Sequence, residues 1–151
     1  MTFHGKGGLR LHGVASWAKV ACNRINNNEY QKPNCVILHC GGNDLMAMKT
    51  IEMRKKLKQV LLNLKELFPD TKVLYSEILP RQDYWYQLST GAGEKTRRKF
   101  NKDTRALAKK ILVPTINHNN ISTDHICHDM VHLTSAGEDI FIDNLFKASL
   151  V

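Results

Sequence analysis

Asp129 and His132, near the carboxyl end of the chain, have the types and spacing of a carboxylate–imidazole pair. They stand three residues apart, just before a segment with the pattern of a helix. In such a turn the carboxylate can accept a hydrogen bond from imidazole Nδ1, which fixes the tautomer and supports the imidazolium. Nε2 is then free to take a proton from a hydroxyl nucleophile. An isolated Asp-x-x-His pair is more often a surface feature than a catalytic one, so the pair needs partners elsewhere.

Two glycine-containing segments could supply those partners. Residues 41–44 (Gly-Gly-Asn-Asp) directly follow an apolar run, and residues 5–8 (Gly-Lys-Gly-Gly) stand near the start. Asn43 could aim its side-chain amide at a developing oxyanion, and Gly8 could add a backbone N–H. Each segment alone is more often an ordinary turn. Their order, and their positions beside strand and helix ends, favour a single constellation.

The elements that must position these residues alternate between strand and helix. Apolar runs at 35–40 and 72–78 predict buried strands, and an apolar stripe between them predicts a helix over 50–68. We expect the two strands to be parallel neighbours, with residues 41–44 at the carboxyl edge where such folds hold ligands. Thr50 and the box starting at Ser135 are expected to cap helices. The remaining expected elements are helices near 9–25, 94–111 and 135–149, an edge strand within 111–116, and an irregular loop over 82–93.

In combination, these segments resemble the SGNH (GDSL-like) hydrolases. Residues 41–44 are similar to the G-x-N-D block of that family, and residues 129–133 to its D-x-x-H block. The resemblance implies an α/β fold: a three-layer α/β/α sandwich around a flavodoxin-like parallel sheet. A narrower likeness, at residues 78–81 (Ile-Leu-Pro-Arg) and after His132, is to SGNH-like domains of animal genomes and retrotransposons.

The resemblance also implies a role for each candidate residue. His132 would be the general base, Asp129 its orienting partner, and Asn43 with Gly8 the oxyanion hole. The substrate would be a small-molecule ester, cleaved through an acyl-serine intermediate without metal or organic cofactor.

The nucleophile of that family lies in a G-D-S-type block that ends the first strand, before the glycine block. No such strand or block precedes Gly5, and Ser76 stands on an expected strand but in the wrong place and order. Either the neighbouring strands pair directly, or the chain is a fragment, which we favour. We therefore expect residues 1–151 to form a single SGNH hydrolase-like domain that is truncated at its amino terminus, lacks its first strand and is inactive by itself.

Two other functions are suggested by parts of the sequence. The helix carrying Lys95–Lys110 is strongly basic within a chain of net charge +8, and residues 84–86 (Tyr-Trp-Tyr) could stack on bases. The alternative function is therefore that of a degenerate domain that binds nucleic acid or protein. The ordinary explanation of these basic residues is a solvated helix face. The cluster of His125, Cys127, His128 and His132 matches no common zinc spacing, so we expect no metal.

Composition restricts the location of the chain. Its 151 residues contain no apolar run long enough to span a bilayer and no signal peptide, so we expect no membrane contact. The four cysteines match no redox or zinc pattern. Reduced thiols and an intracellular location are the expectation.

Overall fold

The computed structural model describes residues 6–84 and 89–151, which form three strands and four long helices. None of these helices is long and apolar enough to cross a membrane. In chain order the elements are α1 (Leu11–Asn26), β1 (Cys35–His39), α2 (Thr50–Leu67), β2 (Lys72–Ser76), α3 (Thr90–Lys110), β3 (Thr115–Ile116), a short 3-10 turn η1 (Thr123–His125) and α4 (Ser135–Leu150).

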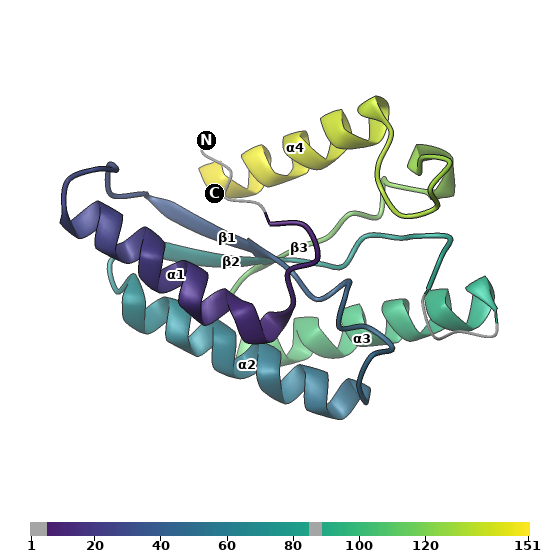
Figure 1. Cartoon of the computed structure of the whole chain (residues 1–151), viewed down its shortest axis with the longest axis horizontal. Helices are drawn as coiled ribbons and strands as arrows, with labels where there is room; N and C mark the ends of the chain where they lie inside the picture. Colours follow the sequence, from purple (N-terminus) through teal and green to yellow (C-terminus); the bar gives the residue numbers. More distant parts are fainter. Residues whose placement is uncertain (1–5, 85–88) are drawn as a thin grey trace.

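The three strands form a parallel sheet in the order β1-β2-β3. Leu38 pairs with Tyr75, and Tyr75 pairs with Thr115. The helices α1, α2 and α3 cover one face of this sheet, and α4 covers the other (Figure 1). The expected parallel pairing and the α/β/α sandwich are both confirmed.

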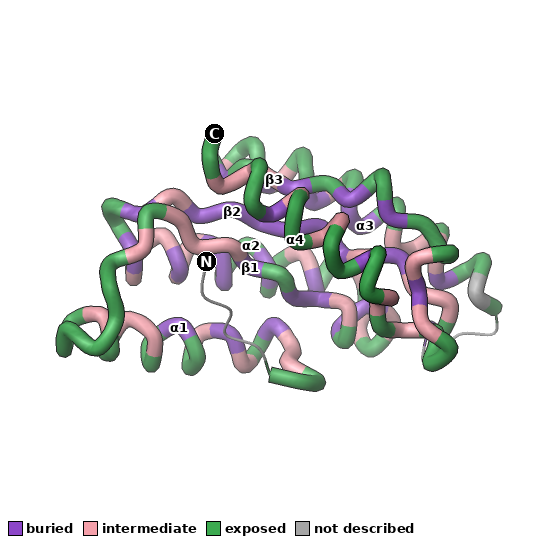
Figure 2. The backbone as a smooth tube through the Cα atoms, turned by 90° about the horizontal axis from the view of Figure 1, so that it is seen from above, coloured by how far each residue is buried: buried purple, intermediate pink, exposed green. Residues whose placement is uncertain are grey.

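The period of two along β2 divides the core between the two faces of the sheet. Val73 and Tyr75 pack with the large cluster beneath α1, α2 and α3, whereas Leu74 packs with Ile116 and with Leu145 of α4. Figure 2 shows buried residues, in purple, along β2 and on the inner sides of the helices. The expected apolar face of α2 is confirmed, because Met53, Leu57, Val60, Leu61, Leu64 and Phe68 are all buried.

The strand β1 is less buried than expected. Cys35, Val36 and Ile37 are only half-buried, and His39 is exposed. The reason is topological: among the described residues β1 pairs only with β2, so its other edge is open.

The start of α3 and the extent of β3 were predicted wrongly. The helix starts at Thr90, inside the expected loop, because the Ser89 side chain accepts a hydrogen bond from Ala92 N (3.3 Å). The strand is limited to residues 115–116, because Leu112 takes a φ of 55° in the turn that leaves α3.

Two of the expected helix caps also lie one residue from their predicted positions. Lys49, not Thr50, precedes α2, and it makes no side-chain cap. Thr134, not Ser135, caps α4 by accepting a hydrogen bond from Gly137 N (3.2 Å).

Candidate active site

Asp129 and His132 lie in contact in the loop between η1 and α4. Asp129 Oδ2 meets His132 Nδ1, while Oδ1 accepts the backbone N–H groups of Val131 and His132, each at 2.9 Å. These bonds, the one from the imidazole first, lower the pKa of Asp129 to about 2. The His132 side chain is 79% exposed. The pair therefore presents an oriented imidazole to solvent.

Backbone contacts fix this loop against the start of α4. Cys127 N donates to His132 O (2.7 Å), and Thr134 N donates to His125 O (2.8 Å). At Gly137 a Cβ would stand 2.7 Å from that same His125 carbonyl oxygen, so only glycine fits. Met130 reverses the chain with a φ of 64°.

The other two candidate residues are joined through Leu9. Asn43 is exposed, and its Nδ2 donates to Leu9 O (3.2 Å). Gly8 is exposed and takes a φ of 70°, in the left-handed region that glycine favours. Thus the loop after β1 holds the loop that precedes α1. Gly5, at the start of the glycine segment, lies outside the described residues.

Asp44 makes a second connection between these loops, which was not predicted from the sequence. Its side chain is fully buried, and Oδ2 accepts the backbone N–H of Leu11 (3.0 Å) in the first turn of α1. Desolvation raises the pKa of this carboxyl. The aspartate next to Asn43 thereby fixes α1, and with it Gly8. No local sequence signal marks this contact, because Asp44 and Leu11 are 33 positions apart.

The loops that carry both pairs lie at the carboxyl edge of the sheet, beyond the ends of the strands (Figure 1). The segment after β2 connects them. On one side, Arg81 lies against Gly42, since a Cβ there would be 2.5 Å from a guanidinium nitrogen. On the other side, the backbone N–H groups of Gln82 and Asp83 donate to Met130 O (2.8 and 3.1 Å). Among the described residues, Asn43 and His132 share no direct hydrogen bond.

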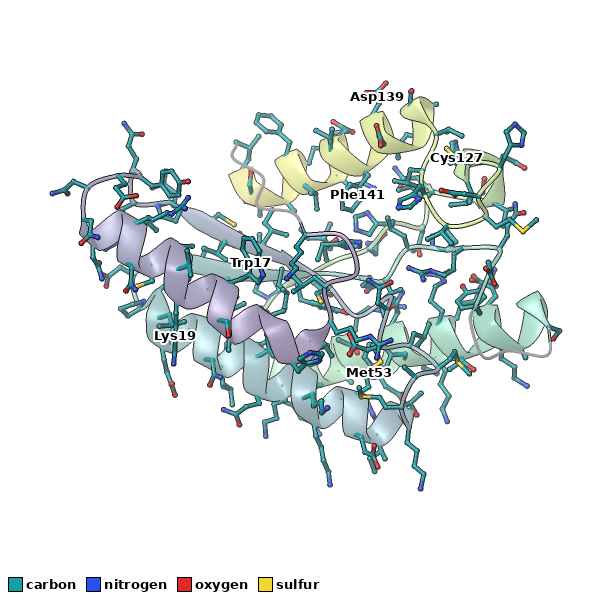
Figure 3. All side chains as sticks on the ribbon, in the orientation of Figure 1. Trp17, Lys19, Met53, Cys127, Asp139 and Phe141 are labelled. Atoms are coloured by element: carbon teal, nitrogen blue, oxygen red, sulfur yellow. The ribbon has the colours of Figure 1, made fainter. Side chains whose placement is uncertain are left out.

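Ser76 lies between two imidazoles under α4, an arrangement that was also not predicted. Its Oγ is 2.9 Å from His39 Nδ1 and 2.7 Å from His118 Nε2, and His118 Nδ1 is 3.1 Å from Asn144 Nδ2. Phe141 lies between α4 and the sheet beside these rings (Figure 3). Ser76 has no exposed surface, so an ester cannot reach it in this conformation.

Two hollows of the described surface do not coincide with these residues. One of about 260 Å³ lies at the amino-terminal ends of β2 and β3, where Lys72, Val73 and Pro114 line it. Another, of about 460 Å³, lies beside the end of α1. The candidate residues lie at the opposite, carboxyl edge of the sheet.

Among the described residues, no three His, Cys, Asp or Glu side chains gather closely enough to hold a metal ion. His125 Nδ1 accepts a hydrogen bond from Ser122 N (3.0 Å), and Cys127 Sγ donates to Leu133 O (3.0 Å). These local bonds occupy two members of the histidine–cysteine cluster.

Some cations of the basic helix α3 form ion pairs, and others form none with the described residues. Arg97 and Arg98 pair with Glu94, and Arg105 pairs with Glu77. Tyr84, one of the expected stacking aromatics, is buried and donates to Glu94 (2.7 Å), so it is not presented to a base. Trp85 and Tyr86 lie outside the described residues.

Comparison with known proteins identifies the family of the chain. Residues 4–140 match the model of the GDSL-like lipase/acylhydrolase family. A solved GDSL-like lipase from Bacteroides thetaiotaomicron VPI-5482 aligns at TM-score 0.74 and 19% identity, over 97% of this chain and 73% of that one. The psychrotrophic esterase EstA from Pseudoalteromonas sp. aligns at TM-score 0.66 and 14% identity, over 93% of this chain and 70% of that one. An acetyl xylan esterase aligns at TM-score 0.65 and 18% identity, over 96% of this chain and 78% of that one. No curated protein matches the sequence.

Proposed function

The chain belongs to the GDSL-like lipase/acylhydrolase family, and on that premise we propose that its domain serves the hydrolysis of small-molecule esters. His132 acts as general base, Asp129 orients it, and Asn43 with Gly8 stabilises the oxyanion. The observation that carries the proposal is the contact of Asp129 Oδ2 with His132 Nδ1 in an exposed loop.

The chemistry follows from the free nitrogen of His132. Because Asp129 holds Nδ1, Nε2 can take the proton of an attacking hydroxyl and later return it to the leaving alcohol. The ester oxygen gains negative charge as the tetrahedral intermediate forms. The Asn43 amide, which now donates to Leu9 O, and the Gly8 N–H are the donors offered to that charge.

The hydroxyl nucleophile is proposed to come from outside these 151 residues, in a G-D-S-type block that ends an additional strand. Two observations support this. Ser76 is buried, and the outer edge of β1 is open among the described residues. A strand added there would end beside Asn43. The domain is accordingly proposed to be inactive by itself.

Hydrolysis of p-nitrophenyl acetate tests this proposal. We expect the chain to be no faster than its His132→Ala variant, because residues of a triad act as a unit. A chain extended upstream by a strand ending in a G-D-S-type block should gain activity. His132→Ala should then reduce that activity by about 10³-fold or more.

The matched control is His128→Ala, which removes an exposed histidine of the same loop and should retain the activity of the extended chain. Strong turnover by the original chain that depends on His132 would overturn the claim of inactivity. An extended chain whose activity is indifferent to both His132 and Asn43 would overturn the site.

A second candidate function is binding of nucleic acid. The observation that favours it is a set of exposed lysines on α2 and α3 that make no ion pair within the described part of the chain. They are Lys55, Lys56, Lys58, Lys95, Lys99, Lys102, Lys109 and Lys110.

A further inference from the structure

Arg81 follows β2 at the end of a short segment that hydrogen bonds hold against α3. Asn101 accepts a hydrogen bond from Ile78 N (3.2 Å) and donates to Ile78 O (3.0 Å). Arg97 also donates to Ile78 O (2.7 Å). Pro80 further restricts the backbone before Arg81. The direction in which the chain leaves β2 is therefore determined by buried contacts.

The guanidinium of Arg81 lies over Gly42, beside Asn43. A Cβ at Gly42 would be 2.5 Å from one guanidinium nitrogen, so the absence of a side chain there makes room for the cation. The next residues, Gln82 and Asp83, are bonded to Met130 O in the loop of His132. Arg81 thus stands between the two halves of the candidate active site.

Arg81 is half-buried, yet it makes no ion pair with a carboxylate among the described residues. Arg54 and Arg97, which are also half-buried, differ because they pair with Asp103 and Glu94. Burial lowers the pKa of Arg81, and nearby Tyr84 and Asp83 oppose this only in part. A half-buried cation that nearby Asp83 compensates only in part is unfavourable, so the site favours an anion that arrives from solution.

We propose that Arg81 binds a negatively charged group of the substrate, a carboxylate or a phosphate, next to the oxyanion donor Asn43. This inference rests on the proposed ester hydrolysis and narrows its substrates to anionic esters. A guanidinium suits the task because its planar fork can donate two parallel hydrogen bonds to either group.

Binding of simple anions tests the proposal on the chain as it is. Succinate and inorganic phosphate are titrated separately, and binding is followed by NMR of the Arg81 side-chain N–H and the Asn43 amide. Arg81→Gln should weaken binding by about tenfold or more, the loss typical of a charge-assisted hydrogen bond. The affinity of Arg81→Lys should lie between those of the parent chain and Arg81→Gln, because lysine keeps the charge but lacks the planar fork of donors. The preferred anion identifies the substrate group as carboxylate or phosphate.

Lys19→Gln is the matched control, since it removes one positive charge from the exposed side of α1 (Figure 3). Its affinity for both anions should equal that of the parent chain. Equal affinities for the parent and Arg81→Gln would overturn the proposal.

Gly42→Ala tests the position of the guanidinium without changing any charge. The new methyl group would occupy the space of the guanidinium end, which can swing away without moving the backbone. We expect an unchanged far-UV circular dichroism spectrum and weaker anion binding. Parent-like affinity in this variant would show that the position over Gly42 is unimportant.

The outcomes separate this inference from the proposed function. Arg81-dependent anion binding together with an inactive extended chain would retain the anion site and reject the ester hydrolysis. If the extended chain is active but the parent chain shows no Arg81-dependent anion binding, the ester hydrolysis is retained and the anion site is rejected.

Discussion

His118 is a buried histidine whose environment favours the neutral form. Its Nε2 meets the hydroxyl of Ser76, its Nδ1 lies near Asn144, and His39 stands on the other side of Ser76. Burial first, and then the charges of His39 and Arg97, lower the pKa of His118 to about 4. In the unfolded chain its pKa is near 6.5.

Folding stability should therefore fall as the pH drops from about 6.5 toward 4. In that window the unfolded chain binds the proton and the folded chain does not, so acid favours unfolding; above the window the effect vanishes. For this one group the loss is about 2 kcal/mol at pH 5. Urea unfolding at pH 7.5 and pH 5 measures it, and His118→Gln should flatten the dependence. A variant that keeps the full slope would assign it to another group.

Sequence patterns predicted the residue contacts that are local and missed those that are not. The contact of Asp129 with His132 was predictable because the two residues are three positions apart in one turn. The network around Ser76 joins the ends of two strands and the segment after the third, and the bond of Asp44 to Leu11 spans 33 positions. Such contacts depend on strand order and register, which the sequence pattern of one element does not contain.

Among the elements, α2 shows how far periodicity reaches and α3 shows where it stops. The apolar stripe of α2 predicted its ends to within one residue, since tertiary packing uses the same face that the period of 3.6 marks. In α3 the first turn contains Gly91 and Gly93, which suggested a loop. The helix forms there nevertheless because Ser89 caps it and Tyr84 packs against Gly93.

Gly93→Ala should destabilise the fold, although alanine is the better helix former. A Cβ at Gly93 would overlap the Tyr84 ring, which is buried and held by Glu94. Overpacking of this kind costs about 1–3 kcal/mol, more than the gain of about 1 kcal/mol in helix propensity. Urea denaturation gives the change in the free energy of unfolding.

Gly91→Ala provides the control in the same turn. Among the described residues, no atom beyond the local helix backbone and the chain neighbours lies within 4 Å of a Cβ there. The helix propensity therefore acts alone, and stability should rise by up to about 1 kcal/mol. Equal effects of the two substitutions would contradict the packing of Tyr84 on Gly93.

For the molecule as a whole, the order of elements was sufficient to predict the layers. Alternating strands and helices permit few arrangements, and right-handed crossovers bring all carboxyl ends of the strands to one edge. The burial of β1 was predicted less well, because the burial of a strand depends on whether another strand covers its outer edge and not only on its own residues. The single domain, its amino-terminal truncation and its intracellular location stay predictions.

The net charge of +8 is also a property of the whole molecule, and it is unevenly distributed. The helices α2 and α3 lie side by side on the same face of the sheet, so their exposed lysines form one basic surface (Figure 1). The helix α4, on the opposite face, has Lys147 paired with Asp143. Unpaired lysines can neutralise phosphates without first breaking an ion pair, and neutralised phosphates release counterions from nucleic acid.

If this surface binds nucleic acid, affinity for a fluorescently labelled single-stranded RNA should fall steeply with salt. Fluorescence anisotropy between 50 and 300 mM KCl would give the slope of log K against log of the salt concentration. The double variant Lys99→Gln/Lys102→Gln should make the slope shallower by about 0.7 for each phosphate that is no longer neutralised. Lys32→Gln/Lys147→Gln removes the same net charge from two lysines that already pair with Asp70 and Asp143, so its slope should match the parent chain. Equal slopes in both double variants would reduce the basic face to a solvated surface, and the ester hydrolysis would then stand as the sole proposed function.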